Sequence, residues 1–184
     1  MSAGPLVVVV TGSECTGKTT LAGDLAAHFG ARTSPEYVRE YLDRKAGPLG
    51  ATDVSPIAHG QVRVEDEAIS SAQRLIIKDT DLVSTVVYSR HYYGECPAWI
   101  ADTAKQRHAD LYLLLRPDVP WLADGLQRDR PEDRAYMHGL FRRELDASGA
   151  RVVDIAGSWD DRLKTAIAAV AKALSQGSSA ARLR

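Results

Sequence analysis

The stretch VVVVTGSECTGKTT, Val7 to Thr20, contains the pattern that decides the fold of this chain. Its four consecutive valines predict a parallel strand covered on both faces, because such strands are continuous apolar runs. The next eight residues, Gly12 to Thr19, match G-x-x-x-x-G-K-[ST] at every fixed position. In such a loop the glycines let successive backbone N–H groups face a phosphate chain. The sequence therefore predicts a P-loop that binds a nucleoside triphosphate, with ATP as the expected nucleotide.

The motif also assigns roles within the loop. Lys18 is expected to reach the β- and γ-phosphates and to act in catalysis, and the Thr19 hydroxyl is expected to coordinate Mg²⁺. The predicted cofactors are therefore ATP and Mg²⁺. The residues predicted to hold the nucleotide are Gly12, Ser13, Glu14, Cys15, Thr16, Gly17, Lys18, Thr19 and Thr20.

Length and composition exclude several classes of protein. The chain has 184 residues, which predicts a single domain over 1–184. A formal net charge of -1 argues against a nucleic-acid binder that works by bulk electrostatics. We find no signal segment and no apolar run of membrane-spanning length, so we expect a cytoplasmic protein. The chain contains no asparagine, which excludes the N-K-x-D guanine motif of GTPases.

Strands alternate with helices along the chain, which predicts an α/β fold with a parallel five-stranded sheet flanked by helices. Ser55 and Pro56 are expected at the N-cap and first position of the third helix, and Pro35 is expected to open the second. A flexible tail is expected over 176–184. Strands are predicted at 6–10, 31–34, 75–78, 111–115 and 151–155, and helices at 20–29, 35–42, 56–73, 82–93, 98–107 and 159–175.

Two aspartates follow the strand LIIK, and their roles differ. Asp79 lies at the strand tip, where P-loop proteins keep a carboxylate for Mg²⁺, so we expect it in the metal shell and in catalysis. Asp81 has three interpretations. It caps the helix that begins at Leu82, serves the metal in place of Asp79, or faces the cationic substrate.

A kinase also needs a group that acts on the acceptor hydroxyl and positive charge over the transferred phosphoryl group. Glu36 follows the second strand at the carboxyl edge of the sheet, where it can orient or deprotonate a hydroxyl. Its structural alternative is a favourable charge in the first turn of a helix. The segment QRDRPEDR suggests a lid in which Arg128 acts in catalysis while Arg130 and Arg134 bind ATP. The alternative for these arginines is a solvated run of charges.

Four segments resemble the nicotinamide riboside kinase domain of NadR-type proteins: GSExTGKTT, PEYVREY, DTDL and DVPWLADGLQR. The resemblance runs from Val7 to about Arg162. It implies a P-loop kinase fold and transfer of the ATP γ-phosphoryl group to the 5′-hydroxyl of nicotinamide riboside, which gives nicotinamide mononucleotide. By resemblance, Glu36 falls where related nucleoside kinases keep their hydroxyl-activating carboxylate. Trp159 and Arg162 lie in GSWDDR, where such kinases commonly contact adenine.

The cationic ring of nicotinamide riboside favours a pocket of aromatic faces and carboxylates. The residues expected to bind this substrate flank the specific motifs and are Glu36, Tyr37, Tyr41, Asp81, Trp121 and Asp124. NadR-type proteins also carry an adenylyltransferase domain, whose H-x-G-H motif is absent here, so a free-standing kinase is expected. A homo-oligomer is left open, because the apolar terminal helix could pack in cis or across a two-fold axis.

Two other functions compete with this reading. The first is a kinase for another nucleoside or for a nucleoside monophosphate, because Arg39, Arg44 and Lys45 could hold an acceptor phosphate. The second is an ATP-binding regulatory module, which would not require a lid with arginines.

Overall fold

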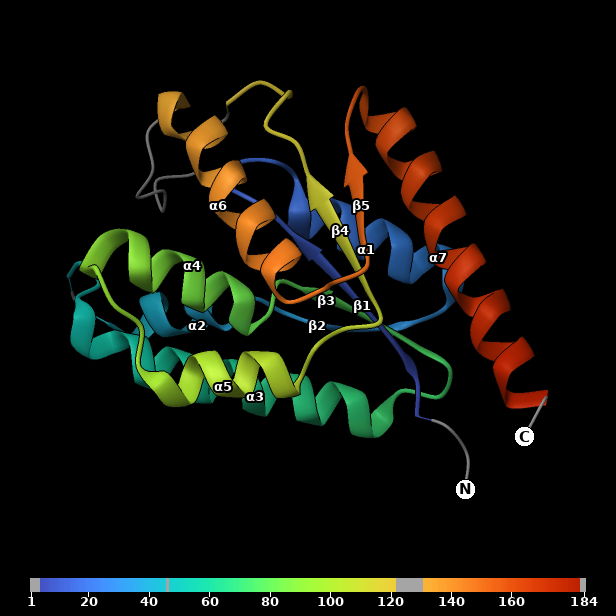
Figure 1. The fold of residues 1–184 in the computed structure, drawn as a ribbon, viewed down its shortest axis with the longest axis horizontal. Coiled ribbons are helices and arrows are strands. Elements are labelled where there is room, and N and C mark those ends of the chain that lie inside the picture. The colour runs from blue at the N-terminus through green and yellow to red at the C-terminus, as the bar shows by residue number, and fades with distance from the viewer. Residues whose placement is uncertain (1–3, 46, 122–130, 183–184) are drawn as a thin grey trace.

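The structure, a computed structural model, describes residues 4–45, 47–121 and 131–182. Its centre is a five-stranded parallel sheet with the strand order β2-β3-β1-β4-β5 (Figure 1). The fold class predicted from the sequence is therefore confirmed. The strands are β1 (Leu6–Thr11), β2 (Arg32–Ser34), β3 (Leu75–Asp79), β4 (Leu111–Leu115) and β5 (Val152–Ile155).

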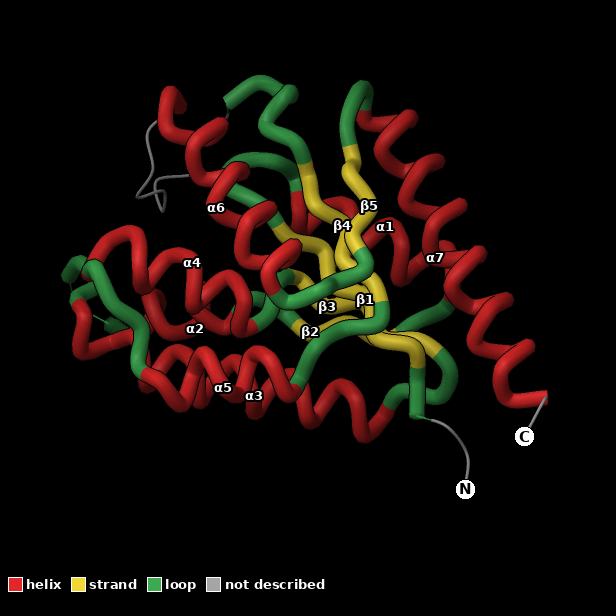
Figure 2. The backbone as a smooth tube through the Cα atoms, viewed as in Figure 1, coloured by secondary structure: helices red, strands yellow, loops and turns green. Residues whose placement is uncertain are grey.

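Helices cover both faces of this sheet, as the tube drawing shows (Figure 2). A short 3-10 helix at Ala51–Asp53 leads directly into α3, and a second at Pro131–Asp133 leads into α6. The α-helices are α1 (Lys18–Phe29), α2 (Tyr37–Arg44), α3 (Val54–Ser71), α4 (Leu82–Tyr93), α5 (Ala98–Gln106), α6 (Arg134–Ala147) and α7 (Trp159–Arg182).

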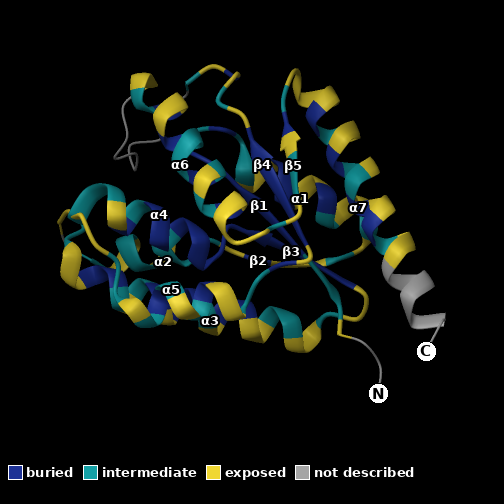
Figure 3. Cartoon of the chain, in the orientation of Figure 1, coloured by how far each residue is buried: buried dark blue, intermediate teal, exposed yellow. Residues whose placement is uncertain are grey.

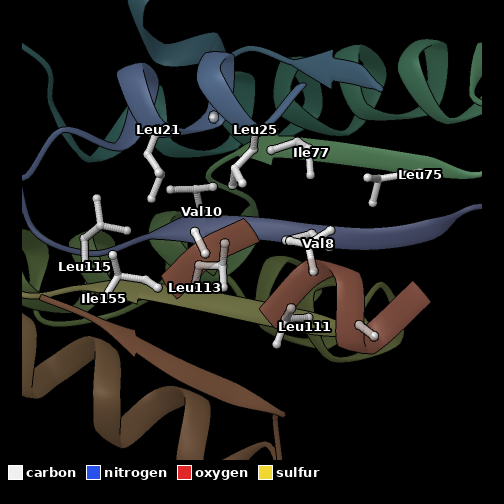
Figure 4. Close-up of a cluster of buried hydrophobic side chains, with 14 residues drawn as sticks. Val8, Val10, Leu21, Leu25, Leu75, Ile77, Leu111, Leu113, Leu115 and Ile155 are labelled. Carbon is white, nitrogen blue, oxygen red and sulfur yellow. The ribbon is translucent and has the colours of Figure 1, made fainter. Parts of the chain in front are cut away.

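The valine run of β1 supplies both cores, because successive side chains of a strand point to opposite faces. Val8 and Val10 pack with Leu21 and Leu25 of α1 and with residues of α7 (Figure 4). Val9 points the other way and packs with residues of α4 and α6. The three central strands β3, β1 and β4 are accordingly the most buried strands of the sheet (Figure 3).

Parallel pairing brings three strand ends to one edge of the sheet. In the register, Val10 of β1 lies beside Asp79 of β3, and Ser34 of β2 lies beside Lys78. The P-loop, Glu36 and Asp79 therefore emerge next to one another, at the edge where open α/β sheets bind ligands.

Several predicted boundaries are wrong. Pro35 does not open α2, which begins at Tyr37 with Glu36 at its N-cap. Ser55 is not the N-cap of α3, because the 3-10 helix already directs the chain into a helix that begins at Val54. The predicted tail over 176–184 is helical as far as Arg182, so α7 is longer than its apolar spacing indicated.

One helix was missed. The sequence analysis placed no helix between β4 and β5, but α6 occupies that interval. Its buried residues Met137, Phe141 and Leu145 recur at the four-residue spacing of a helix face. The apolar spacing of this helix is present in the sequence, but the many charged residues between the apolar positions made it hard to recognise.

Candidate active site

The P-loop backbone takes conformations that favour glycine. Gly12 has φ +137° and Gly17 has φ +85°. A Cβ on Gly12 would lie 2.9 Å from the Leu115 carbonyl oxygen, and one on Gly17 would lie 2.5 Å from the Trp159 ring. Cys15 also has a positive φ, of +53°. Both glycines are thus required for conformation and for space, as the motif predicted.

The loop is closed by its own side chains. The Thr16 hydroxyl and the Lys18 ammonium both donate to the Ser13 carbonyl, each at 2.9 Å. Gly17 at the N-cap of α1 has no side chain, so no side-chain oxygen accepts from the first amides of the helix. Those N–H groups and the helix dipole favour an anion at this point.

Two buried arginines support the loop from behind. Arg162 is 1 % exposed and donates to the carbonyls of Thr16 at 3.1 Å and of Arg116 at 2.7 Å, and it pairs with Asp118. Arg134 is 6 % exposed and donates to the Cys15 carbonyl at 3.3 Å. These contacts give both arginines a structural task in shaping the loop, and ATP binding by either stays a prediction.

Trp159 lies at the outer side of the loop. Its ring packs against Gly17 and lies over the Arg162 guanidinium, with 5.5 Å from the ring centroid to Cζ. The side chain is 52 % exposed and leaves room for a stacking partner. This position is compatible with the predicted contact to adenine.

Thr19 and Asp79 meet as the metal prediction requires. The Thr19 hydroxyl donates to Asp79 Oδ2 at 2.6 Å, while Asp79 Oδ1 is buried without a hydrogen-bond partner. Burial raises the pKa of Asp79 and the nearby Glu36 raises it further, whereas the Thr19 hydroxyl and Lys18 oppose the shift. A divalent cation would supply the missing positive charge. The pair suits Mg²⁺, which is usually held by one or two protein groups together with phosphates and water.

Asp81 is the cap of α4. Its Oδ1 accepts from the Val83 N–H at 3.0 Å, and its Oδ2 accepts from the Tyr112 hydroxyl at 2.8 Å. Burial raises the pKa of Asp81 to about 6, and the neighbouring carboxylate of Glu65 adds to the shift. The capping interpretation is confirmed. Asp81 also lines the cavity described next, so its predicted substrate contact stays open.

A cavity of about 410 Å³ adjoins the loop and lies between the P-loop, α2, α3 and α4. This volume is within the ordinary range for small-molecule sites. Lys18 lines it from the P-loop and Glu36 from the start of α2. The other acidic, basic and aromatic residues on its described wall are Glu14, Asp81, Arg39, Tyr88 and Tyr93.

Glu36 itself is partly buried and faces the same space as Lys18. Its Oε2 pairs with Arg39 Nε at 3.3 Å, and its charge acts on Asp79. Glu36 also occupies the N-cap position, but its side chain makes no capping hydrogen bond. The carboxylate instead pairs with Arg39 of the same helix and lines the cavity, which is the position that the functional interpretation of Glu36 requires.

The three rings favoured by the sequence analysis do not line this cavity. Tyr37 packs on Gly60 of α3, and the Tyr41 hydroxyl donates to Asp53 Oδ1 at 2.7 Å. Trp121 lies beside Arg134, 5.7 Å from ring centroid to Cζ. The three rings were predicted because they lie next to the specific motifs in the sequence. The orientation of α2, however, turns its two tyrosines toward α3 and the 3-10 helix before it.

The aromatic wall comes instead from α4, through Tyr88 and Tyr93. Sequence reasoning assigned none of Tyr88, Tyr93 and Gln61 to the site. Their spacing carries no motif, so only the packing of α3 and α4 beside the loop could reveal them. The predicted residues Asp124, Arg128 and Arg130 lie outside the described residues.

Comparison of the sequence with protein-family models shows which family this chain belongs to. A family model described as "AAA domain" matches residues 7–162. The chain belongs to this AAA domain family. Within the described residues, no helix is both long enough and apolar enough to cross a membrane.

Proteins with known names are also similar to this chain in sequence and in structure. The trifunctional NAD biosynthesis/regulator protein NadR of Escherichia coli (strain K12) is 29 % identical over 153 residues, which are 80 % of this chain and 37 % of NadR. The crystal structure of NadR protein in complex with NR superposes with a TM-score of 0.77 and 28 % identity, covering 93 % of this chain and 52 % of that chain.

A second NadR structure, in complex with NAD and AMP-PNP, has a TM-score of 0.73 and 27 % identity, and covers 92 % and 50 % of the two chains. This AAA domain chain therefore spans between about a third and a half of the relatives it matches. The similarity supports a P-loop phosphotransferase fold that binds nucleotides.

Proposed function

We propose that this chain is an ATP-dependent kinase that phosphorylates the 5′-hydroxyl of nicotinamide riboside to give nicotinamide mononucleotide. The observation that carries the proposal is a single cavity that joins the P-loop lysine, Lys18, to the carboxylate of Glu36. One wall suits the triphosphate, and the opposite wall offers a base for an acceptor hydroxyl. The NadR structure in complex with NR supports this choice of acceptor.

Each residue of the site then has a chemical task. The P-loop amides and Lys18 hold the triphosphate, and Thr19 and Asp79 hold Mg²⁺. When bound, Mg²⁺ neutralises charge that develops on the phosphate oxygens. Glu36 orients the acceptor hydroxyl and accepts its proton as the oxygen attacks the γ-phosphorus, while the bridging P–O bond to the β-phosphate breaks and ADP leaves.

The wall of the cavity matches a cationic acceptor. Asp81, Glu36 and Glu14 contribute acidic groups, and Tyr88 and Tyr93 contribute aromatic rings. A cation over an aromatic ring is stabilised by about 0.5–2 kcal/mol, depending on desolvation. The site thus offers both kinds of group that recognise the positively charged nicotinamide ring.

Of the three cations that could hold an acceptor phosphate, Arg39 alone lines the described wall, and it pairs with Glu36 at 3.3 Å. Arg44 donates to Glu40 at 2.5 Å and to the Tyr37 hydroxyl at 3.0 Å, and Lys45 donates to Asp53 at 2.5 Å. Neither Arg44 nor Lys45 is among the described residues that line the cavity. Two of the three cations that could have held a monophosphate are therefore engaged elsewhere, which favours a nucleoside over a nucleotide.

The test is product formation from ATP and Mg²⁺ with nicotinamide riboside, beside a panel of other nucleosides and monophosphates, followed by mass spectrometry. Glu36→Gln should lower kcat for the acceptor roughly 10²–10⁴-fold, as expected for loss of a general base, and leave the affinity for ATP unchanged. Glu40→Gln is the matched control, because Glu40 lies on the same helix outside the cavity wall.

The outcomes separate the competing functions. Stimulation by a different acceptor would keep the kinase and reassign its substrate. ATP binding without phosphorylation of any acceptor, together with association that depends on the nucleotide, would favour a regulatory module. Unchanged kcat in Glu36→Gln would reject Glu36 as the base.

A further inference from the structure

Glu36 lies on a helix that the apolar core does not anchor. None of the residues of α2 is buried, and its first turn packs on α3 through the partly exposed ring of Tyr37 against Gly60. The first N–H groups of a helix also lack partners within the helix. Something outside α2 must hold the peptide units around Glu36 if its carboxylate is to be positioned accurately.

The side chain of Gln61, on α3, makes these contacts. Its Oε1 accepts from the Tyr37 N–H at 2.9 Å, and its Nε2 lies 3.4 Å from the Pro35 carbonyl oxygen. One carboxamide thus binds the peptide groups on both sides of Glu36. Gln61 is only 3 % exposed, so water competes little for these hydrogen bonds.

The orientation of the carboxamide follows from its partners. Nε2 also donates to Glu65 Oε1 at 3.2 Å, so the amide nitrogen faces two acceptors while the oxygen faces a donor. The reversed amide would oppose N–H to N–H and oxygen to oxygen. Gln61 is therefore held in one orientation by the network.

Glu65 connects this contact to the sheet. It is 1 % exposed, and its Oε2 accepts from Lys78 Nζ at 2.6 Å and from Arg107 at 3.3 Å. Lys78 precedes Asp79 in β3 and pairs in register with Ser34 of β2. A chain of polar contacts thus runs from the strand that carries the metal aspartate to the backbone of Glu36.

We propose that Gln61 is a positioning residue that fixes Glu36 relative to Asp79, so that the carboxylate meets the acceptor hydroxyl. The inference rests on the proposed kinase function and goes beyond it by assigning the residue through which the base is placed. Gln61 acts through Glu36, and the Glu65–Lys78 pair supplies the rigid support.

The test combines catalysis with amide exchange. Gln61→Met keeps the length of the side chain and removes both polar ends. We expect kcat/KM for nicotinamide riboside to fall about 10–100-fold, as for other supporting residues of active sites, with the Kd for ATP unchanged. We also expect the Tyr37 amide, followed by NMR, to exchange about tenfold faster, since loss of one hydrogen bond has that size.

The matched control is Gln73→Met, the same substitution at an exposed position just beyond the end of α3. Should Gln61→Met not fold, Gln61→Asn removes the contacts by shortening the side chain. In a Glu36→Gln background the Gln61 substitution should cause almost no further loss, because it acts through the missing carboxylate.

The proposal would be overturned if the Tyr37 amide exchanged at the same rate in Gln61→Met as in the wild type. It would also be overturned if the losses of kcat/KM caused by Glu36→Gln and by Gln61→Met multiplied in the double variant. Failure of the wild-type protein to phosphorylate nicotinamide riboside would reject the proposed function instead. The two failures are distinguishable, because amide exchange reports on the Gln61 contact without any acceptor.

Discussion

The two walls of the cavity are built in different ways. On the nucleotide side, the P-loop is continuous with β1 and α1, and α1 buries Leu21, Ala22 and Leu25 in the core. On the acceptor side, α2 buries no residue and is held by polar contacts to Gln61 and Asp53. The nucleotide wall is anchored by apolar packing, whereas α2 on the acceptor side is held mainly by hydrogen bonds.

This difference bears on how specificity can change. A single hydrogen bond contributes about 0.5–1.5 kcal/mol to stability, whereas a buried leucine contributes about 1.5–3 kcal/mol. Substitutions near α2 should therefore alter the acceptor site at small expense in stability. Substitutions around the P-loop should abolish binding or unfold the domain.

The largest effect is expected at Lys18. Lys18→Met removes the charge that faces the triphosphate, so the rate of acceptor phosphorylation should fall at least about 10³-fold, at the upper end for loss of one electrostatic contact. Steady-state kinetics measures this loss. Lys105→Met, at an exposed site on α5, is the control. If Lys18→Met lowered the rate of acceptor phosphorylation less than Glu36→Gln does, the expectation that Lys18 has the largest effect would be contradicted.

The next effect is expected at Arg162. Arg162→Met leaves the Thr16 and Arg116 carbonyls without their donor and removes the partner of Asp118. We expect the free energy of unfolding in urea to fall by about 1–3 kcal/mol, as when a buried polar group loses its hydrogen-bond partner, because the Asp118 side chain is 40 % exposed and its charge stays hydrated. Arg151→Met, which is exposed, should change it little. Equal stability of the two variants would show that the P-loop does not depend on this support.

The pH dependence of stability tests Asp81, which lies between the two walls. Its pKa is raised to about 6 by burial, so its charged form is disfavoured in the folded state. Its contribution is fully present below pH 4 and is lost as the pH rises through 6, by about 3 kcal/mol for a shift of about two units. Asp81→Asn should lack this part of the pH dependence. The difference between the two proteins in urea unfolding at pH 4 and pH 7 measures it, and parallel profiles would refute it.

The smallest effect is expected on the acceptor wall, at Asp53. Hydrogen bonds from Lys45, from the Tyr41 hydroxyl and from the Gly50 N–H lower the pKa of Asp53 to about 2. Its contribution is present above pH 4 and is lost as the pH falls toward 2. Asp53→Asn should reduce stability at pH 7 by about 1 kcal/mol, because the pair with Lys45 is partly exposed. The gap should close in acid, and a gap that persists at pH 2 would refute the assignment.

Much of the fold could be predicted from the sequence. The strand over 111–115 and the helix over 82–93 have the predicted bounds, because apolar runs and a capping aspartate mark them locally. The start of α3 and the whole of α6 were missed. Their signals compete with nearby prolines and charges, and tertiary packing decided the outcome.

The residues of the nucleotide half follow from one motif, whereas of the described residues predicted for the acceptor half only Glu36 and Asp81 line the cavity. The motif carries its own geometry, so the Thr19 hydroxyl meets Asp79 as expected, while Lys18 donates to the Ser13 carbonyl and its charge acts on Asp79. The cavity rings Tyr88 and Tyr93 come from a helix that no motif connects to the loop.

The sequence by itself determined the strand and turn of the P-loop, since the conformations of Gly12 and Gly17 depend on their missing side chains. The tertiary structure alone decided which side chains face the acceptor. The orientation of α2 places Tyr37 on Gly60. It also brings Gln61 to the peptide units around Glu36, although the two residues are 25 positions apart in the sequence. The physical reason is that a side chain's direction depends on how its helix packs, and that packing is set by residues far away in the chain.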